Sequence, residues 1–361
     1  MKSPRRLADS RVAAVLPAAL IALAASGGLV ALAGVSPLDA YRSIWSGGLG
    51  STSALGTTLV MLLPLLFAAL AFAVPFRAGL YNIGVEGQLY LGALSSAVVG
   101  LKLHAPTYVV LPVAVLAGMA AGMAWAVIPA LLKVTRGVNE IVSSLFLNYV
   151  AIYFTNWLLA GPLEAPNIGV AQTSIIPDAA HFPVLVADTK ITYALLLALV
   201  VVVLVQALFR TPFGFDLRIM GASGKVADYL GIRSGRATIV AFAISGAIGG
   251  LAGVCEVLGN QFFLSQDFSP GWGYTGIAVA VLGGGVAWGI ALAAAFFGVI
   301  GAGALQMQFV NQLSPSFALV VQAVAVIVVL LFLEWRSRGA RRAADRPEHA
   351  SPAAPTEAVE A

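Results

Sequence analysis

Amide and carboxylate side chains inside long apolar stretches are the residues of this chain that could do chemistry. Asn82, Glu86 and Gln88 open one such stretch, and a helix would place Asn82 and Glu86, four residues apart, on one face. Such groups are costly in hydrocarbon, so they usually face a bundle interior or a water-filled path. Their hydrogen bonds would suit a hydroxylated solute. Two interpretations stay open: that they line a solute path, or that they only hold neighbouring helices together.

A second polar series follows Arg136-Gly-Val-Asn-Glu140. At 100° per residue, its polar side chains fall within an arc of about 80°, so they should face protein or water. Glu140 could also stand at a helix start, where the helix dipole favours a carboxylate. The candidate path residues are therefore Asn82, Glu86, Gln88, Glu140, Ser144 and Asn148, with Thr155 on the same face as the last three.

Other chemically suggestive residues have simpler explanations. Glu256, near Asn260 and Gln261, is expected at the membrane interface. The single cysteine, Cys255, excludes an internal disulfide and a cysteine-rich metal site. An interfacial aromatic belt, rather than stacking on a substrate, explains the aromatic side chains where two spans end: Phe262, Phe263, Phe268, Trp272 and Tyr274. The histidines are scattered and predict no metal pair: His104, His181 and His349.

The composition shows what must position these groups. Of 361 residues, 60% are hydrophobic and 10% charged, and the mean hydropathy is +0.93, which excludes a water-soluble fold. Because about 20 apolar residues span a bilayer, the chain predicts an all-α bundle of about ten transmembrane helices. The expected spans are 12–35, 55–74, 84–101, 108–132, 138–160, 191–209, 237–258, 273–282, 288–307 and 317–333.

The basic residues predict the orientation of these spans. With a cytoplasmic N-terminus, 17 of the 20 Lys and Arg residues fall in cytoplasmic segments, as the positive-inside rule requires. The basic charge is thus a topology signal, and no nucleic-acid partner is expected. We expect residues 1–11 to be a cytoplasmic N-terminus, 12–333 a transmembrane domain and 334–361 a disordered cytoplasmic tail. The first apolar run is interpreted as an uncleaved span rather than a signal peptide, and the proline-rich segment 159–190 as an extended outer loop.

The cytoplasmic loop 210–236 should contain a short helix over 224–230, with Ser223 as its N-cap and Gly231 as its stop. Gly224-Lys225 superficially resembles a phosphate-binding loop. The spacing fails because Ile219 occupies the first glycine position and Val226 follows the lysine. ATP binding by this chain is therefore rejected, and an ATP-driven transporter would need its motor on another subunit.

Four segments in order resemble the permease subunits of bacterial ABC importers for nucleosides and simple sugars, which are related to the ribose and branched-chain amino-acid permeases. The similar segments are Phe76-Arg-Ala-Gly-Leu-Tyr-Asn-Ile-Gly-Val-Glu-Gly-Gln88, Arg136-Gly-Val-Asn-Glu-Ile-Val142, the loop 211–232, and Gly276-Ile-Ala-Val-Ala-Val-Leu-Gly-Gly284 with Trp288-Gly289. The resemblance covers about 55–333. The chain departs from the commonest pattern of the family at Val85 and at Gly285-Val286-Ala287, the turn after the eighth span.

The resemblance implies a permease in the bacterial plasma (inner) membrane, not an enzyme. Its partners would be a cytosolic ATP-binding subunit carrying ATP and Mg²⁺, a second permease, expected to be a paralogue, and an extracytoplasmic substrate-binding protein. No cofactor is expected in this chain itself. The ATPase-coupling residues would be Arg218, Gly221, Lys225, Asp228, Leu230 and Gly231.

There are two alternative functions to weigh, and a choice of solute. A proton-coupled secondary transporter could use Glu86 or Glu140 as its proton site. A metal-dependent lipid or prenyl transferase would need clustered carboxylates, which the sequence lacks. For an importer, a nucleoside is the first expected solute, a simple sugar the second and a branched-chain amino acid the third.

Overall fold

The computed structural model describes residues 27–28, 31, 36–311, 323–324 and 327. The chain divides into two compact units, 1–37 with 319–361, and 38–318, and the second contains nearly all the described residues. Within the described residues the regular structure is helical, and extended pairing is limited to two isolated bridges. This agrees with an all-α membrane protein.

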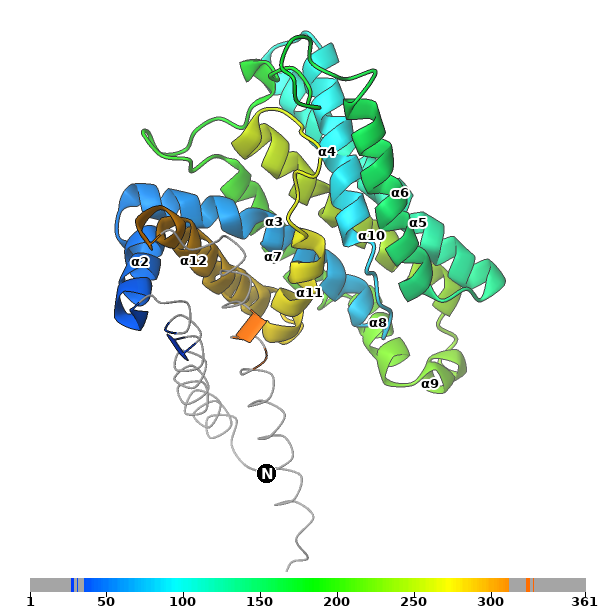
Figure 1. Cartoon of the computed structure of the whole chain (residues 1–361). Coiled ribbons are helices and arrows are strands. Elements are labelled where there is room, and N and C mark those ends of the chain that lie inside the picture. Colours follow the sequence, from blue (N-terminus) through cyan, green and yellow to red (C-terminus); the bar gives the residue numbers. More distant parts are fainter. Residues whose placement is uncertain (1–26, 29–30, 32–35, 312–322, 325–326, 328–361) are drawn as a thin grey trace, which may run out of the picture. The chain divides into compact units, whose positions relative to one another are not determined.

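Two helices precede the segment that contains Asn82, Glu86 and Gln88, and most of the helices after it are long and apolar (Figure 1). In chain order the helices are α2 (Pro37–Leu49), α3 (Thr52–Phe76), α4 (Val85–Lys102), α5 (Thr107–Arg136), α6 (Glu140–Leu159), η1 (Asp178–Ala180), α7 (Ala194–Leu208), α8 (Pro212–Ala222), α9 (Gly224–Tyr229), α10 (Ser234–Glu256), η2 (Val257–Gln261), α11 (Trp272–Leu282) and α12 (Ala287–Asn311).

Five of these helices are long and apolar enough to cross a membrane: α3, α5, α6, α10 with η2, and α12. A sixth span is possible if α7 and α8, bent by 68° at their junction, count as one. α4 and the shorter α11 coincide with two further predicted spans. Eight predicted spans thus fall on helices, whereas those at 12–35 and 317–333 lie outside the described residues, apart from isolated positions.

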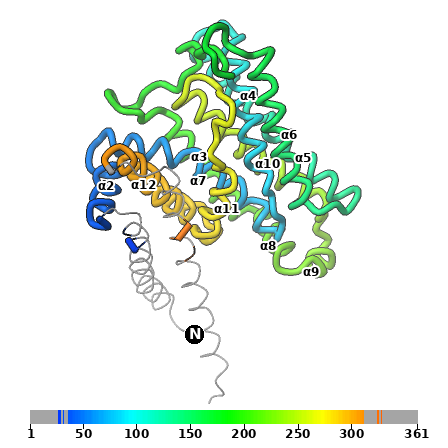
Figure 2. The backbone as a smooth tube through the Cα atoms, in the orientation of Figure 1, coloured from blue at the N-terminus to red at the C-terminus, as the bar shows by residue number. Residues whose placement is uncertain are grey.

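α3 forms the centre of this unit, because most of its surface is covered by other helices. It packs against α10, α11, α12 and α7, all far later in the chain. Figures 1 and 2 show α3 passing between α2 with α12 on one side and the group α4, α5, α6 and α10 on the other. A helix that is apolar all round suits such an enclosed position.

The packing of α5 against α10 depends on glycine. Gly118 and Gly122 of α5, and Gly246 and Gly250 of α10, each form a small-xxx-small pair, and the helix backbones meet there. A Cβ at Gly122 would overlap the backbone oxygen of Gly246. Small residues let helices approach closely and gain dispersion contacts, which replace the hydrophobic driving force inside a bilayer.

The connecting segments follow the sequence expectation in part. The segment 160–193 contains turns and bends but no α-helix, and its regular structure is the short helix η1. It pairs through one bridge, Gln172 with Ser265, to the segment after η2. In the predicted coupling loop, α9 has Ser223 as its N-cap, whose Oγ accepts from the N–H of Val226, and Gly231 follows with φ +72°. The predicted short helix is thereby confirmed.

α8 was not predicted, although the local signals for it are present in the sequence. Its N-cap, Thr211, accepts a hydrogen bond from the N–H of Gly214, and Pro212 occupies the first helical position. The loop therefore consists of two consecutive helices rather than one.

Candidate functional site

The start of α4 lies at the centre of a buried polar cluster. The sequence predicted Asn82 and Glu86 on one helical face, but α4 begins at Val85 and Asn82 lies in the turn before it. Asn82 uses its Oδ1 to accept from the N–H of Gly84 at 3.0 Å, a local bond that competes with helix formation. The shared-face prediction is therefore wrong, although both side chains are buried.

Asn82 connects three helices through its amide group. Its Nδ2 donates to Oγ of Ser245 in α10 at 2.8 Å, and Ser245 in turn donates to the carbonyl of Ala71 in α3 at 2.6 Å. Asn82 also exchanges hydrogen bonds with the side-chain amide of Gln88, at 3.1 and 3.3 Å. These groups satisfy one another, as buried polar groups must.

Glu86 binds the start of α11. Its Oε2 accepts from the backbone N–H of Gly273 at 2.6 Å, and Glu86 is 2% exposed. The free N–H groups at a helix start favour a carboxylate. The missing side chain of Gly273 permits this approach, since a Cβ there would stand 2.7 Å from both Cα and Oε2 of Glu86.

Asn148 brings α6 to the same place. Its Oδ1 accepts from the N–H of Gly87 at 2.8 Å, and its Nδ2 donates to the carbonyl of Ile83 at 2.9 Å and to the hydroxyl of Tyr274 at 3.2 Å. Tyr274 therefore takes part in this network and is more than a member of an aromatic belt, which corrects the sequence interpretation. We call the following residues the α4 polar cluster: Asn82, Glu86, Gln88, Asn148, Ser245 and Tyr274.

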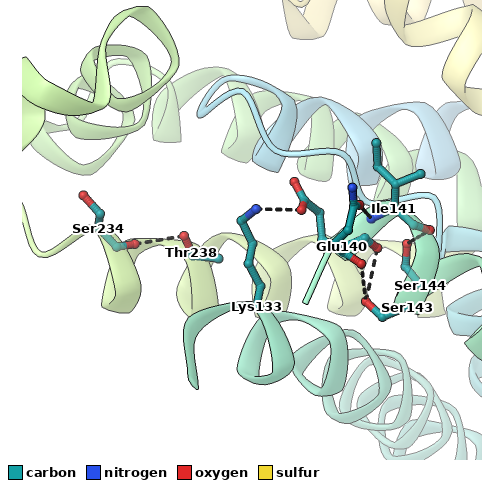
Figure 3. A network of polar contacts seen from close by, with 8 residues as sticks. Lys133, Glu140, Ile141, Ser143, Ser144, Ser234 and Thr238 are labelled. Atoms are coloured by element: carbon teal, nitrogen blue, oxygen red, sulfur yellow. Dashed lines mark hydrogen bonds and ion pairs between the residues drawn. The ribbon is translucent and has the colours of Figure 1, made fainter. Parts of the chain in front are cut away.

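The hydrogen bonds of Glu140 and Ser144 do not involve members of this cluster. Figure 3 shows both residues in a local network with Lys133, Ile141 and Ser143. Glu140 is the first residue of α6, beside the N-cap Asn139, and its Oε2 lies 2.6 Å from Nζ of Lys133. Ser144 donates to the carbonyl of Ile141 at 3.3 Å. All four members of the predicted stripe on α6 are buried, which confirms that it faces protein: Glu140, Ser144, Asn148 and Thr155.

Glu256 is buried inside the protein, which its predicted place near the end of a span did not indicate. It is 3% exposed, and its Oε1 accepts from the side-chain amides of Asn260 at 2.7 Å and Gln261 at 2.9 Å. The π-helical turn η2 extends α10 beyond Glu256 and brings these two amides back over the carboxylate. Within the described residues, no three His, Cys, Asp or Glu side chains are close enough to hold a metal ion.

Residues 54–330 match the model of a family described as the permease component of the branched-chain amino acid transport system. The chain belongs to this permease family. Among its relatives is a glucose ABC transporter permease protein of Haloferax volcanii, 32% identical over 340 residues, which cover 91% of this chain and 90% of the relative.

Two further relatives of this permease have nucleoside names. A guanosine ABC transporter permease protein of Bacillus subtilis is 31% identical over 87% of this chain and 91% of its own length. A nucleoside ABC transporter permease protein of Lactococcus lactis is 31% identical over 84% and 86% of the two chains. No solved structure matches this permease. The family resemblance predicted from the sequence is confirmed, and the chain is a membrane transport component, as its relatives named permease proteins of ABC transporters are.

The predicted coupling loop of this permease is in contact with the segment that leads into the cluster. Gly221, in the last turn of α8, lies so close to Arg77 that a Cβ would overlap the backbone oxygen of Arg77. Arg77 places its guanidinium 3.7 Å from the ring centroid of Phe209 and donates to the carbonyl of Gly285 at 3.3 Å. The ends of α3, α7 and α8 and the turn before α12 therefore meet at one residue.

The other predicted coupling residues lie on the surface of the loop. Leu230 is 60% exposed, and Ala227 is buried beneath α9. A cavity of about 550 Å³ lies between α8, the turn after α9 and the first turns of α10. Most of the remaining predicted coupling residues are exposed as well: Arg218, Lys225, Asp228 and Gly231.

Proposed function

We propose that this permease forms the translocation path of an ATP-binding cassette importer for a nucleoside, with a simple sugar as the second choice of solute. The observation that carries the proposal is the similarity along most of the chain to permeases named for guanosine and nucleosides, beside one named for glucose. The branched-chain amino acids in the family description rank third.

The α4 polar cluster supports a path beside α4, α6 and α11. Its members use their polar atoms on one another and on backbone groups, which favours bracing the helices around the path over direct contact with solute. In the proposal all six predicted path residues brace the helices around the path, and Glu140 and Ser144 do so in the first two turns of α6. The six residues are Asn82, Glu86, Gln88, Glu140, Ser144 and Asn148. A network of satisfied polar groups fixes one arrangement of helices.

Coupling to a partner ATPase is proposed at the α8–α9 loop. The exposed Leu230 and its neighbours would contact a cytosolic ATP-binding subunit, which binds ATP and Mg²⁺. The contact of Gly221 with Arg77 lies five residues before Asn82, so a displacement of α8 would reach the α4 polar cluster through a short, packed segment. Alternating access would follow from tilting the helices that this cluster joins.

The assembly and orientation belong to the same proposal. Ten spans with both termini in the cytoplasm agree with the distribution of Lys and Arg. A second, paralogous permease and an extracytoplasmic substrate-binding protein would complete the importer in the bacterial plasma membrane.

The first test is uptake of a radiolabelled purine nucleoside and of ribose in cells with and without this chain. The proposal expects nucleoside uptake that disappears with the chain and after ATP depletion, and that persists with a protonophore while ATP is maintained. Uptake that follows the proton gradient would instead support the proton-coupled secondary transporter. Loss of ribose uptake alone would move the substrate to sugars.

A further inference from the structure

The outward face of α6 differs in chemistry from the exposed faces of α5 and α7, and its exposed tyrosines also set it apart from α12, whose exposed aromatic side chains are Trp288, Phe296 and Phe309. On α7 the large exposed side chains are aliphatic: Leu196, Leu199, Val200, Val203 and Leu204. On α5 they are aliphatic or Met apart from Tyr108 in the first turn. On α6, by contrast, most are aromatic: Phe146, Tyr149, Tyr153, Phe154 and Trp157, beside Val142 and Val150. Leucine and valine suit lipid tails, whereas the phenols on α6 need another explanation.

Tyr149 and Tyr153 lie too deep in the span for an interfacial belt. Tyr149 is the tenth of the twenty residues of α6, about 14 Å from the helix start at 1.5 Å per residue. Aromatic belts lie at the two membrane surfaces, which accounts for Trp157 but not for Tyr149. The two tyrosines are 50% and 68% exposed, and neither hydroxyl has a hydrogen-bond partner among the described residues. A hydroxyl facing hydrocarbon without a partner is unfavourable.

Polar groups continue from these tyrosines toward the end of α6. At 100° per residue, Asn156, Tyr149 and Tyr153 fall within an arc of about 60°. Nδ2 of Asn156 donates to Oδ1 of Asp267 at 2.9 Å in an exposed position. At the other end of this series, Tyr274, 37% exposed, is joined to α6 through Asn148. Hydrogen-bonding groups thus extend from the helix end to mid-span.

The two rings are also arranged as a stacking surface. Tyr149 and Tyr153 lie parallel, with ring centroids 6.5 Å apart and planes at 24°. Consecutive turns of one helix thereby present two aromatic faces with a hydroxyl at the rim of each. Aromatic faces attract flat or apolar ring surfaces, and a phenol both donates and accepts hydrogen bonds.

We propose that the face of α6 formed by Tyr149, Tyr153 and Asn156, together with Tyr274, lines the water-filled solute path from its outer opening to mid-membrane. The inference rests on the proposed importer function and adds the surface that touches the solute. The ring of a neutral nucleoside or sugar stacks on the tyrosines while its hydroxyls bond to the phenols. These four side chains are uncharged, and the carboxylate bonded to Asn156, that of Asp267, lies at the end of the helix. From there to mid-span a solute is held weakly at each step and leaves easily, as conduction through a path requires.

The first test measures access of water to α6 in the complete transporter. Cys255 is the only cysteine and is 3% exposed, so a Cys255→Ala chain gives a cysteine-free background. Tyr149→Cys and Tyr153→Cys are compared with Leu199→Cys and Leu204→Cys on the aliphatic face of α7. Each variant is exposed to a membrane-impermeant cationic methanethiosulfonate, in intact cells and in inverted vesicles.

Thiolates form in water and not in hydrocarbon, so the two α6 positions are expected to react at least about tenfold faster than the α7 positions from one side or the other. A purine nucleoside should slow that reaction. Reaction at the α7 rate from both sides would overturn the inference, because lipid or a tightly packed partner would then cover this face.

Uptake kinetics separate stacking from simple exposure. Tyr153→Leu is expected to raise the KM for nucleoside about five- to hundredfold, the range of base stacking on aromatic side chains, whereas Tyr153→Phe retains the ring and changes KM less. Equal KM values for both variants and the wild type would refute contact with the solute. Normal nucleoside uptake with unreactive α6 cysteines would refute this inference alone, and reactive cysteines without nucleoside uptake would refute only the proposed substrate.

Discussion

Gly273→Ala should separate α11 from α4 by a predictable amount. A Cβ at this position would stand 2.5 Å from the backbone N and 2.7 Å from Cα and Oε2 of Glu86. Ordinary van der Waals contact begins at 3.4 Å, so the start of α11 must retreat by about 0.9 Å to relieve the shortest of these contacts. The hydrogen bond from the Gly273 N–H to Glu86 would then lengthen from 2.6 Å to about 3.5 Å and lose most of its strength.

Two costs follow from this retreat. A weakened hydrogen bond to a buried charged group costs about 1.5–3 kcal/mol, and overpacking costs about 1–3 kcal/mol. Because moving the helix relieves one cost while causing the other, we expect a total of about 2–5 kcal/mol. At roughly 2–4 °C per kcal/mol, the Tm of the purified complex should fall by about 5–15 °C.

The matched control is Gly301→Ala in α12, where the nearest atoms belong to the Met61 side chain at 3.7 Å. It should leave the Tm unchanged within about 1 °C, because an added methyl there meets ordinary contacts only. Thermal unfolding of both variants in the same detergent, followed by size-exclusion chromatography, makes the comparison. An equal Tm for the two variants would refute the proposed close contact between Glu86 and α11.

Two further predictions concern the proposed coupling loop and the start of α6. Leu230→Asp should abolish uptake while ATP hydrolysis by the assembled complex continues. The variant should still fold, because an exposed side chain contributes about 0.5 kcal/mol or less to stability. Uptake at the wild-type rate would show that α9 is not part of the coupling site. Lys133→Ala should lower the free energy of unfolding by only about 1 kcal/mol, because Lys133 is one-third exposed and water screens its ion pair with Glu140. A loss above about 3 kcal/mol in thermal unfolding would contradict this, since a loss of that size is typical of a buried ion pair that has lost one partner.

Local sequence patterns were sufficient to predict most helices. Long apolar stretches predicted the eight spans that coincide with described helices, and the capping residues Ser223 and Gly231 predicted α9 nearly to its ends. α8 was missed because the apolar pattern between Thr211 and Ala222 is short, and only its cap and first-turn proline indicated a helix.

The partners within the site could not be predicted in the same way. Ser245 lies 163 residues from Asn82, and Gly273 lies 187 residues from Glu86. Residue type and spacing indicate that a buried amide or carboxylate needs a partner, but only the packing of helices selects which distant residue supplies it. The burial of Glu256 was missed because a π-helical turn, which has no simple sequence signal, folds its amide partners over it.

The enclosure of α3 by later helices has a consequence for how the chain is made. When α3 leaves the ribosome, the residues of α10, α11 and α12 that will cover it are still more than 150 positions away and not yet synthesised. The helix must therefore be stable first in lipid and only afterwards in protein, and its mean hydropathy of 2.5 suits the first environment as well as the second. Its small and aliphatic residues form a surface that lipid can solvate during synthesis. Later helices can then take the place of that lipid without leaving a polar group exposed.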